Sequence, residues 1–180
     1  FNFAGLNEEY SNIKRAKVVV LPVPYERTTS YKKGAANGPR SIIAASTYME
    51  TFDDELNQET FRAGIHTMDE LIMNDLPHEE VNKKVSEAIK EIIKANKFPV
   101  ILGGEHSISA GSVAAFKESY EDLSVLYLDA HYDLRNEFDD TKFSHACVAR
   151  RISEIAPVVE VGVRSMSKEE KDFLNDLPEG

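Results

Sequence analysis

Short apolar runs alternate with segments of helical periodicity along the whole chain. Four runs, rich in β-branched residues and flanked by turn formers, predict buried strands at 18–21, 99–102, 124–128 and 158–163. Four periodic segments predict helices at 41–48, 79–97, 109–120 and 146–155. Because strands alternate with helices, we expect an α/β fold, a three-layer sandwich in which helices cover both faces of a parallel sheet.

Local signals mark where several elements begin or end. Pro22 is expected to end the first strand, and Pro39 fits the first turn of a helix. Ser167 and Glu170 form a capping box, which predicts the start of a final helix. The polar segment Met49–Thr60 is expected to be a loop. The length of 180 residues predicts a single α/β domain over residues 1–180.

Charge and composition limit the classes of molecule that the protein is expected to bind. The formal net charge is -10, which opposes binding to nucleic acid and would attract a cationic substrate. Taken alone, an acidic balance more often serves only to keep a protein soluble. The longest apolar runs are too short to span a membrane, so no membrane partner is expected. Cys147 is the only cysteine and cannot form an internal disulfide, which fits a cytoplasmic location.

Three ionisable residues follow the predicted strand 124–128 at alternate positions. Asp129, His131 and Asp133 would face the same side if the backbone stayed extended beyond the strand. Two carboxylates and an imidazole suit a divalent transition metal such as Mn²⁺, and without a cation they would repel or desolvate one another. The pattern therefore predicts a metal site, with a surface turn of incidental charges as the alternative.

Two further motifs place histidines near strand ends. His106 follows a pair of glycines after the strand 99–102, where ligands of parallel α/β sheets gather. Glu105 is expected to support a ligand or to begin a helix. His145 lies before a helix and is a candidate for proton transfer. Taken singly, either histidine is more typical of a hydrogen-bonded structural residue.

Together, these motifs resemble the ureohydrolase family, which includes arginase, agmatinase and formiminoglutamase. The resemblance rests on three segments with metal or proton chemistry and two near the N-terminus: 103–107, 129–133, 144–145, 29–34 and 38–40. It covers almost the whole chain and is strongest toward agmatinase. Many relatives have glycine where this chain has Ala146, and a branch of agmatinase-like proteins shares Ala146, Cys147 and the later pair of arginines, so the resemblance fixes the chemistry more firmly than the substrate.

The resemblance implies a fold, a cofactor and a reaction. It implies an arginase-like fold with two Mn²⁺ ions, one held by His106, Asp129 and Asp133. His131 would hold the other ion, with Asp129 bridging, and His145 would assist proton transfer. The implied reaction is hydrolysis of agmatine to putrescine and urea, in polyamine biosynthesis. The family also implies a homo-oligomer, a trimer or a hexamer.

The chain departs from the family pattern after its last strand-like run. The family supplies two more metal-binding aspartates in an Asp-x-Asp pattern, but here Val163 leads into Arg164 and Ser165. We therefore expect residues 1–180 to correspond to the first part of such an enzyme and to be inactive alone. The alternatives are a truncated non-catalytic chain or an unrelated metal-dependent phosphoesterase.

The segment after Asp133 carries a hint about the substrate. It contains Glu137, Asp139 and Asp140, which would repel the α-carboxylate of arginine and suit a small cationic guanidino substrate such as agmatine. Arginase, guanidinobutyrase or formiminoglutamase activity stays open, because Arg135 or Lys142 would pair with a carboxylate.

Overall fold

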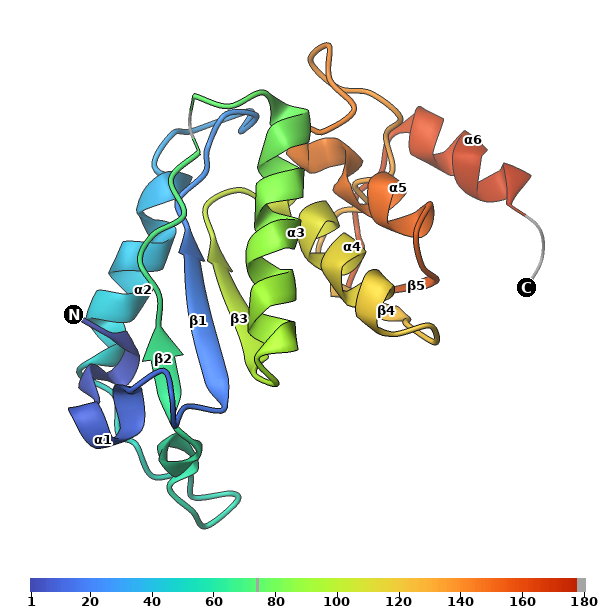
Figure 1. The fold of residues 1–180 in the computed structure, drawn as a ribbon. Helices are drawn as coiled ribbons and strands as arrows, with labels where there is room; N and C mark the ends of the chain where they lie inside the picture. The colour runs from blue at the N-terminus through green and yellow to red at the C-terminus, as the bar shows by residue number, and fades with distance from the viewer. Residues whose placement is uncertain (74, 178–180) are drawn as a thin grey trace. The chain divides into compact units, whose positions relative to one another are not determined.

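The computed structural model describes residues 1–73 and 75–177, and these form two compact units (Figure 1). The first unit comprises residues 1–27, 31–75 and 88–105. The second comprises residues 28–30, 76–87 and the chain from His106 on. The structure thus groups three residues from the N-terminal part, 28–30, with the C-terminal unit. The expectation of a single domain stays a prediction.

A parallel three-stranded sheet forms the centre of the first unit. Its order is β2 (Ile65–Thr67), β1 (Val18–Val23) and β3 (Phe98–Gly103). Val18 pairs with Ile65 on one side and with Phe98 on the other. Residues 19–23 of the central strand are all buried, as expected for a parallel strand that is covered on both faces. β1 and β3 were predicted from sequence, whereas β2 was not.

Pro22 lies inside β1, so the prediction that it ends the strand is wrong. The carbonyl groups of Val20 and Pro22 accept hydrogen bonds from residues 68 and 71, on the β2 side. The missing N–H of Pro22 would therefore point to the side where β2 has already ended at Thr67. Proline costs no ladder hydrogen bond there, and the strand continues along β3 to Val23.

The helices of the first unit agree with the periodic pattern. α2 (Gly38–Ser46) begins slightly before the predicted range, with Pro39 in its first turn. α3 (His78–Lys94) begins in the second unit and ends in the first, and its buried residues recur at helical spacing: Val81, Val85, Ile89 and Ile92. The remaining short helical elements were not predicted: η1 (Phe3–Gly5), α1 (Glu8–Ser11), η2 (Ala35–Asn37) and η3 (Thr60–Ala63).

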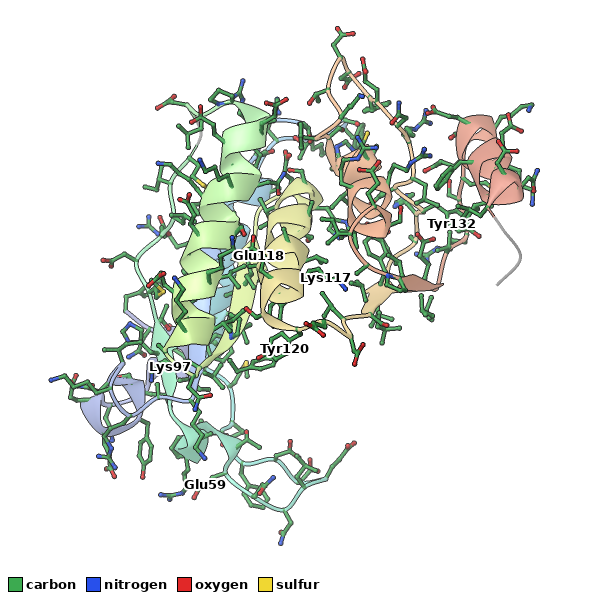
Figure 2. All side chains as sticks on the ribbon, turned by 45° about the vertical axis from the view of Figure 1, so that its right-hand side comes forward. Glu59, Lys97, Lys117, Glu118, Tyr120 and Tyr132 are labelled. Atoms are coloured by element: carbon green, nitrogen blue, oxygen red, sulfur yellow. The ribbon has the colours of Figure 1, made fainter. Side chains whose placement is uncertain are left out.

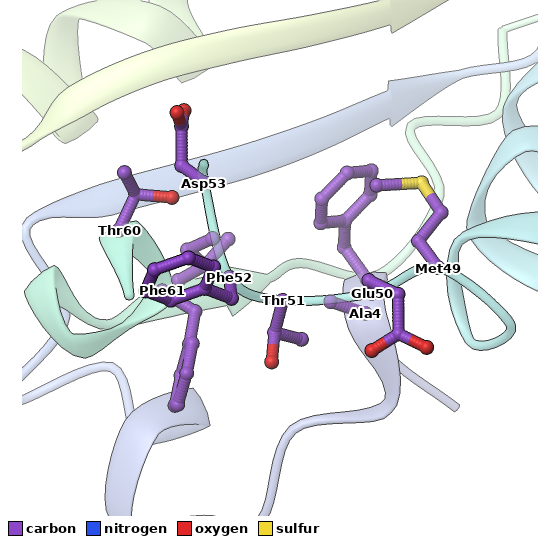
Figure 3. Close-up of a pocket in the computed structure, with 10 residues that line it drawn as sticks. Ala4, Met49, Glu50, Thr51, Phe52, Asp53, Thr60 and Phe61 are labelled. Carbon is purple, nitrogen blue, oxygen red and sulfur yellow. The ribbon is translucent and has the colours of Figure 1, made fainter. Parts of the chain in front are cut away.

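The predicted loop is confirmed over residues 49–59, with Thr60 already in η3, and it borders a cavity of about 230 Å³ in the first unit (Figure 3). The wall includes Met49, Phe52 and Phe61, with Glu50 and Asp53 as its acidic members. No histidine or cysteine is among its lining residues. Among the described residues that line it, the only ionisable ones are therefore two carboxylates, with no imidazole or thiol beside them.

Gly104 allows two backbone segments of the first unit to meet closely. A Cβ atom at this position would lie 2.2 Å from the carbonyl oxygen of Tyr25. That oxygen already accepts a hydrogen bond of 2.9 Å from the N–H of Glu105, so it cannot simply move away. We expect Gly104→Ala to lower the free energy of unfolding by about 2 kcal/mol or more, as overpacking does. Urea denaturation measures this, and an unchanged midpoint would contradict the account.

The second unit packs helices against a parallel pair of strands. β4 (Val125–Leu128) pairs with β5 (Val158–Val161), and Tyr127 lies opposite Glu160. The helical elements are α4 (Ser109–Ser119), α5 (Val148–Ser153), α6 (Lys168–Asp176), η4 (His106–Ile108) and η5 (His145–Cys147). The core contains Tyr127, Leu134 and residues of α4 and α5, and Tyr132 packs against it (Figure 2).

The capping box predicted at Ser167 is present. Its hydroxyl accepts from the N–H of Glu170, and the Glu170 carboxylate accepts from the N–H of Ser167. Glu170 is also buried and accepts a 3.0 Å hydrogen bond from the N–H of Leu134. One side chain therefore fixes both the start of α6 and the segment that follows Asp133. Within the described residues, no helix has the length and apolar character needed to cross a membrane.

Candidate metal centre and active site

The backbone bends at Ala130, just after Asp129, and does not keep the strand conformation as far as Asp133. The N–H of Asp129 still bonds the carbonyl of Val161 on β5, at 3.2 Å. Asp133 has a φ of 50°, a left-handed conformation that Asp tolerates better than most residues. The prediction that simple strand alternation aligns residues 129, 131 and 133 is therefore wrong. With this left-handed backbone, the carboxylate of Asp133 lies near that of Asp129.

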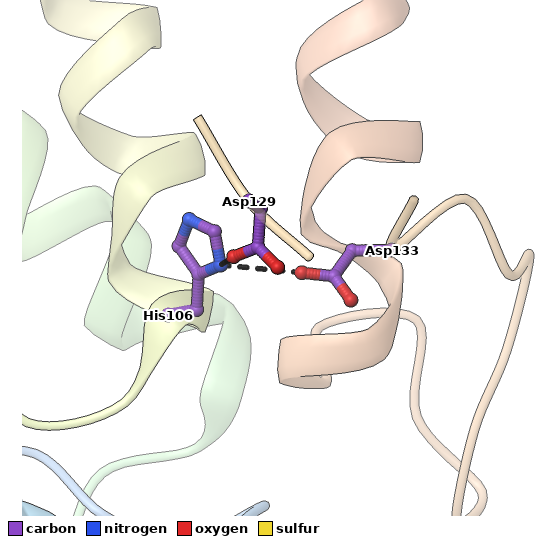
Figure 4. Close-up of side chains that lie close together, drawn as sticks. All are labelled: His106, Asp129 and Asp133. Atoms are coloured by element: carbon purple, nitrogen blue, oxygen red, sulfur yellow. Dashed lines mark ion pairs between the residues drawn. The ribbon is translucent and has the colours of Figure 1, made fainter. Parts of the chain in front are cut away.

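The structure gathers His106, Asp129 and Asp133 around one point (Figure 4). Nδ1 of His106 lies 3.5 Å from Oδ2 of Asp129 and 3.2 Å from Oδ2 of Asp133. One potential ligand atom from each residue lies within 4.8 Å of the others. Two carboxylate oxygens and one imidazole nitrogen at this spacing fit a divalent transition metal, which would also neutralise the repulsion between the carboxylates.

His131 lies at the edge of this group and does not belong to it. The ring atom Nδ1 of His131 is 3.2 Å from Oδ1 of Asp129, and the backbone N–H of His131 donates to the same oxygen at 2.7 Å. The side chain of His131 is 64% exposed, against 24% for Asp129. The two oxygens of Asp129 therefore face different histidines, Oδ2 toward His106 and Oδ1 toward His131.

His145 lies outside the three-residue group and is held by hydroxyl groups. The backbone N–H of His145 donates to Oγ1 of Thr28 at 3.0 Å. Its Nδ1 is 3.2 Å from the same Thr28 oxygen, and its Nε2 is 3.3 Å from Oγ of Ser30. The ring of Phe138 meets the imidazole edge-on, with the ring centres 6.0 Å apart. The imidazole thus has a hydroxyl contact at each nitrogen.

Thr28 and Ser30 were not predicted as site residues. They belong to the same compact unit as His145, although they precede it by more than a hundred positions. Ser30 had a sequence signal, because it lies in the segment 29–34 that contributed to the family resemblance, whereas Thr28 lies outside that segment. The resemblance gave no role for either hydroxyl, since the contact depends on the tertiary fold.

A cavity of about 250 Å³ joins several of these residues. His131, Asp133 and His145 line it, together with Arg135 and Glu170. The acidic residues of the following loop are exposed and are absent from the lining: Glu137, Asp139 and Asp140. These three residues therefore do not line the cavity in which a substrate would bind, and the charge argument for a cationic substrate gets no support from them.

Two ionisable side chains near the carboxylates have raised pKa values: Glu160, which is half-buried on β5, and Tyr127, which is buried on β4. Burial raises the pKa of Glu160 to about 7, and Asp133, Glu170 and Asp129 add to the shift by repulsion. Burial and the Asp133 carboxylate raise the pKa of Tyr127 above its usual range. Glu160 was not predicted as a site residue, although a lone carboxylate within the apolar strand 158–161 was a signal. The buried carboxylate of Glu105 accepts a hydrogen bond from the N–H of Arg27 at 2.8 Å, and its support of a ligand stays a prediction.

Fold and sequence together define the class of protein. Residues 16–178 match the model of the Arginase family, and the chain belongs to this family. The resemblance to ureohydrolases is thus confirmed, as is the arginase-like α/β fold class. The structure resembles that of the agmatine ureohydrolase of Thermoplasma volcanium, with a TM-score of 0.85 and 28% identity over 96% of this chain and 58% of that one.

Two curated relatives are similar over nearly all of this chain. N(1)-aminopropylagmatine ureohydrolase of Synechocystis sp. is 34% identical over 94% of this chain and 58% of its own length. The protein of the same name from Thermococcus kodakarensis is 37% identical over 92% of this chain and 58% of its own length. The chain therefore spans a little under three-fifths of the relatives that it matches.

Proposed function

We propose that the polypeptide containing this sequence is a manganese-dependent ureohydrolase that acts on agmatine or a closely related guanidino amine. The observation that carries the proposal is the convergence of His106, Asp129 and Asp133 beside a cavity that His145 also lines. Among the residues that the structure describes, no other group of three or more histidine, cysteine or acidic side chains has this geometry.

The donor set suits two ions that share Asp129. His106, Asp129 and Asp133 would hold one ion. His131, together with Asp129, would hold the other. The observed contacts support this division, because each histidine approaches a different oxygen of Asp129. A pair of divalent ions lowers the pKa of a shared water and so supplies a nucleophile at neutral pH.

His145 is the group that we expect to handle protons. Its nitrogens contact Thr28 and Ser30, whose hydroxyls accept or donate as the tautomer of the ring requires. The imidazole can therefore give a proton to the departing amine at one nitrogen while a hydroxyl steadies the other. Its position on the wall of the cavity fits that role.

The names of the relatives make the guanidino amine the favoured substrate class, with N(1)-aminopropylagmatine as a second candidate beside agmatine. Charge supports an amine over an amino acid. Asp133 and Glu170 line the cavity, while Arg135 already lies 3.9 Å from Glu169 and over the ring of Phe138. An α-carboxylate would therefore have to compete with Glu169 for Arg135, the arginine on the cavity wall.

The test compares substrates that differ by a single group. With Mn²⁺ added, the natural polypeptide containing residues 1–180 should release urea from agmatine or N(1)-aminopropylagmatine. Its kcat/KM for arginine, which differs from agmatine by the α-carboxylate, should be lower by at least about tenfold, or about 1.4 kcal/mol. Preference for arginine or guanidinobutyrate would contradict the substrate class. Failure to release urea from any guanidino compound would contradict the activity.

A further inference from the structure

Tyr127 connects two of the proposed metal ligands from inside the core. It is only 5% exposed and lies on β4, two positions before Asp129. Its hydroxyl donates to Oδ2 of Asp133 at 2.8 Å and lies 3.2 Å from Nδ1 of His106. Its ring also stacks on the His106 imidazole, with centres 5.0 Å apart and planes inclined by 23°. These contacts reach the same two atoms that face the proposed metal.

We propose that Tyr127 is a positioning residue of the metal centre, which sets the orientation of Asp133 and His106 before a metal binds. This inference rests on the proposed function, since it assumes that these two residues are ligands. Supporting residues of this kind orient the ligands of metal sites and change metal affinity without touching the metal.

The phenol has one proton, and its location follows from the partners. An ionised Asp133 carboxylate can only accept, so the proton of Tyr127 lies on the shorter contact, toward Asp133. Nδ1 of His106 does not receive that proton and can keep its lone pair for a metal. The stacked ring then fixes the plane of the imidazole without a hydrogen bond.

Asp133 depends on this contact more than the other ligands do. Its backbone is in the left-handed region, and its side chain is 11% exposed. Among the described residues, Tyr127 is the only hydrogen-bond donor to its carboxylate. Loss of the hydroxyl would leave the carboxylate buried and free to turn away from His106, so the gathered arrangement would have to be re-formed whenever a metal binds.

The test uses Tyr127→Phe, which keeps the buried ring and removes only the hydroxyl. Tyr132→Phe is the matched control, because Tyr132 packs against the same core, and within the described part of the chain its hydroxyl makes no hydrogen bond to a proposed ligand. Isothermal titration calorimetry with Mn²⁺ alone should show affinity about 10- to 100-fold weaker for Tyr127→Phe. The control should stay within about twofold of the wild type, since it leaves all ligands and their partners in place.

The outcomes separate the inference from the proposed function. If the wild type and Tyr127→Phe bind Mn²⁺ equally while Asp133→Asn binds poorly, the metal centre stands and the positioning role is wrong. If the wild type binds no Mn²⁺, the proposed centre fails and the inference fails with it. Thermal unfolding without metal distinguishes a folding defect: an affinity loss that also appears in an equally destabilised Tyr132→Phe would overturn the specific role of the hydroxyl.

Discussion

Asp129→Asn should remove most of the metal affinity of this protein. The substitution keeps the size and shape of the side chain but removes the charge and replaces one of the two carboxylate oxygens with an NH₂ group. Those oxygens face His106 and His131 separately, so either orientation of the amide places an NH₂ group toward one of the two proposed ions. We expect the Kd for Mn²⁺ to rise by more than about 100-fold, because even changes to residues that only support ligands cost roughly 10- to 100-fold.

Asp122→Asn is the matched control for this measurement. Asp122 is exposed, lies shortly before β4 in the same unit, and belongs to neither the three-residue group nor the cavity. It controls for the loss of one negative charge from a protein with a net charge of -10. Equal losses of affinity in the two variants would show that overall charge attracts the ion, and Asp129 would lose its assignment as a ligand.

His145→Ala should separate catalysis from metal binding. The imidazole lies outside the group formed by His106, Asp129 and Asp133, so its removal should leave the bound Mn²⁺ nearly unchanged. Turnover of the natural polypeptide should fall by a factor on the order of 10² to 10⁴, the usual contribution of a positioned proton-transfer group. Metal content by atomic emission and urea release measure the two effects on the same sample.

His145→Gln refines the test. Glutamine can still bond to the hydroxyls of Thr28 and Ser30, but it cannot carry a proton at neutral pH. Both variants should therefore turn over substrate slowly and contain as much Mn²⁺ as the wild type. If His145→Gln were as active as the wild type, the residue would support the structure of the site and would have no part in proton transfer. Loss of metal in both variants would reassign it as a ligand.

Sequence patterns predicted the elements whose signals are local. Periodicity predicted the apolar stripe on α3. Apolar runs and flanking residues predicted β1, β3 and the capping box at Ser167. β2 was missed because it has three residues, and its apolar signal is one isoleucine followed by His66 and Thr67. Pro22 was misread because its effect depends on where the neighbouring strand ends, which the sequence of β1 does not contain.

The candidate site was predictable in its residues and less so in its geometry. The spacing of Asp129 and Asp133 indicated that they would meet, but a bend at Ala130 and a left-handed backbone at Asp133 replace the strand alternation that was assumed. The roles of Tyr127, Thr28 and Ser30 depend on contacts between distant or buried positions. A tyrosine in an apolar strand is ordinarily core, and only its hydroxyl contacts show a second role.

The most direct test of the central claim is the position of a bound metal. Crystals of the protein grown with Mn²⁺ would be measured by anomalous diffraction at the manganese absorption edge. The account predicts a peak about 2 Å from Nδ1 of His106 and from carboxylate oxygens of Asp129 and Asp133. A structure in which these side chains hold no manganese, while the ion binds elsewhere, would contradict it.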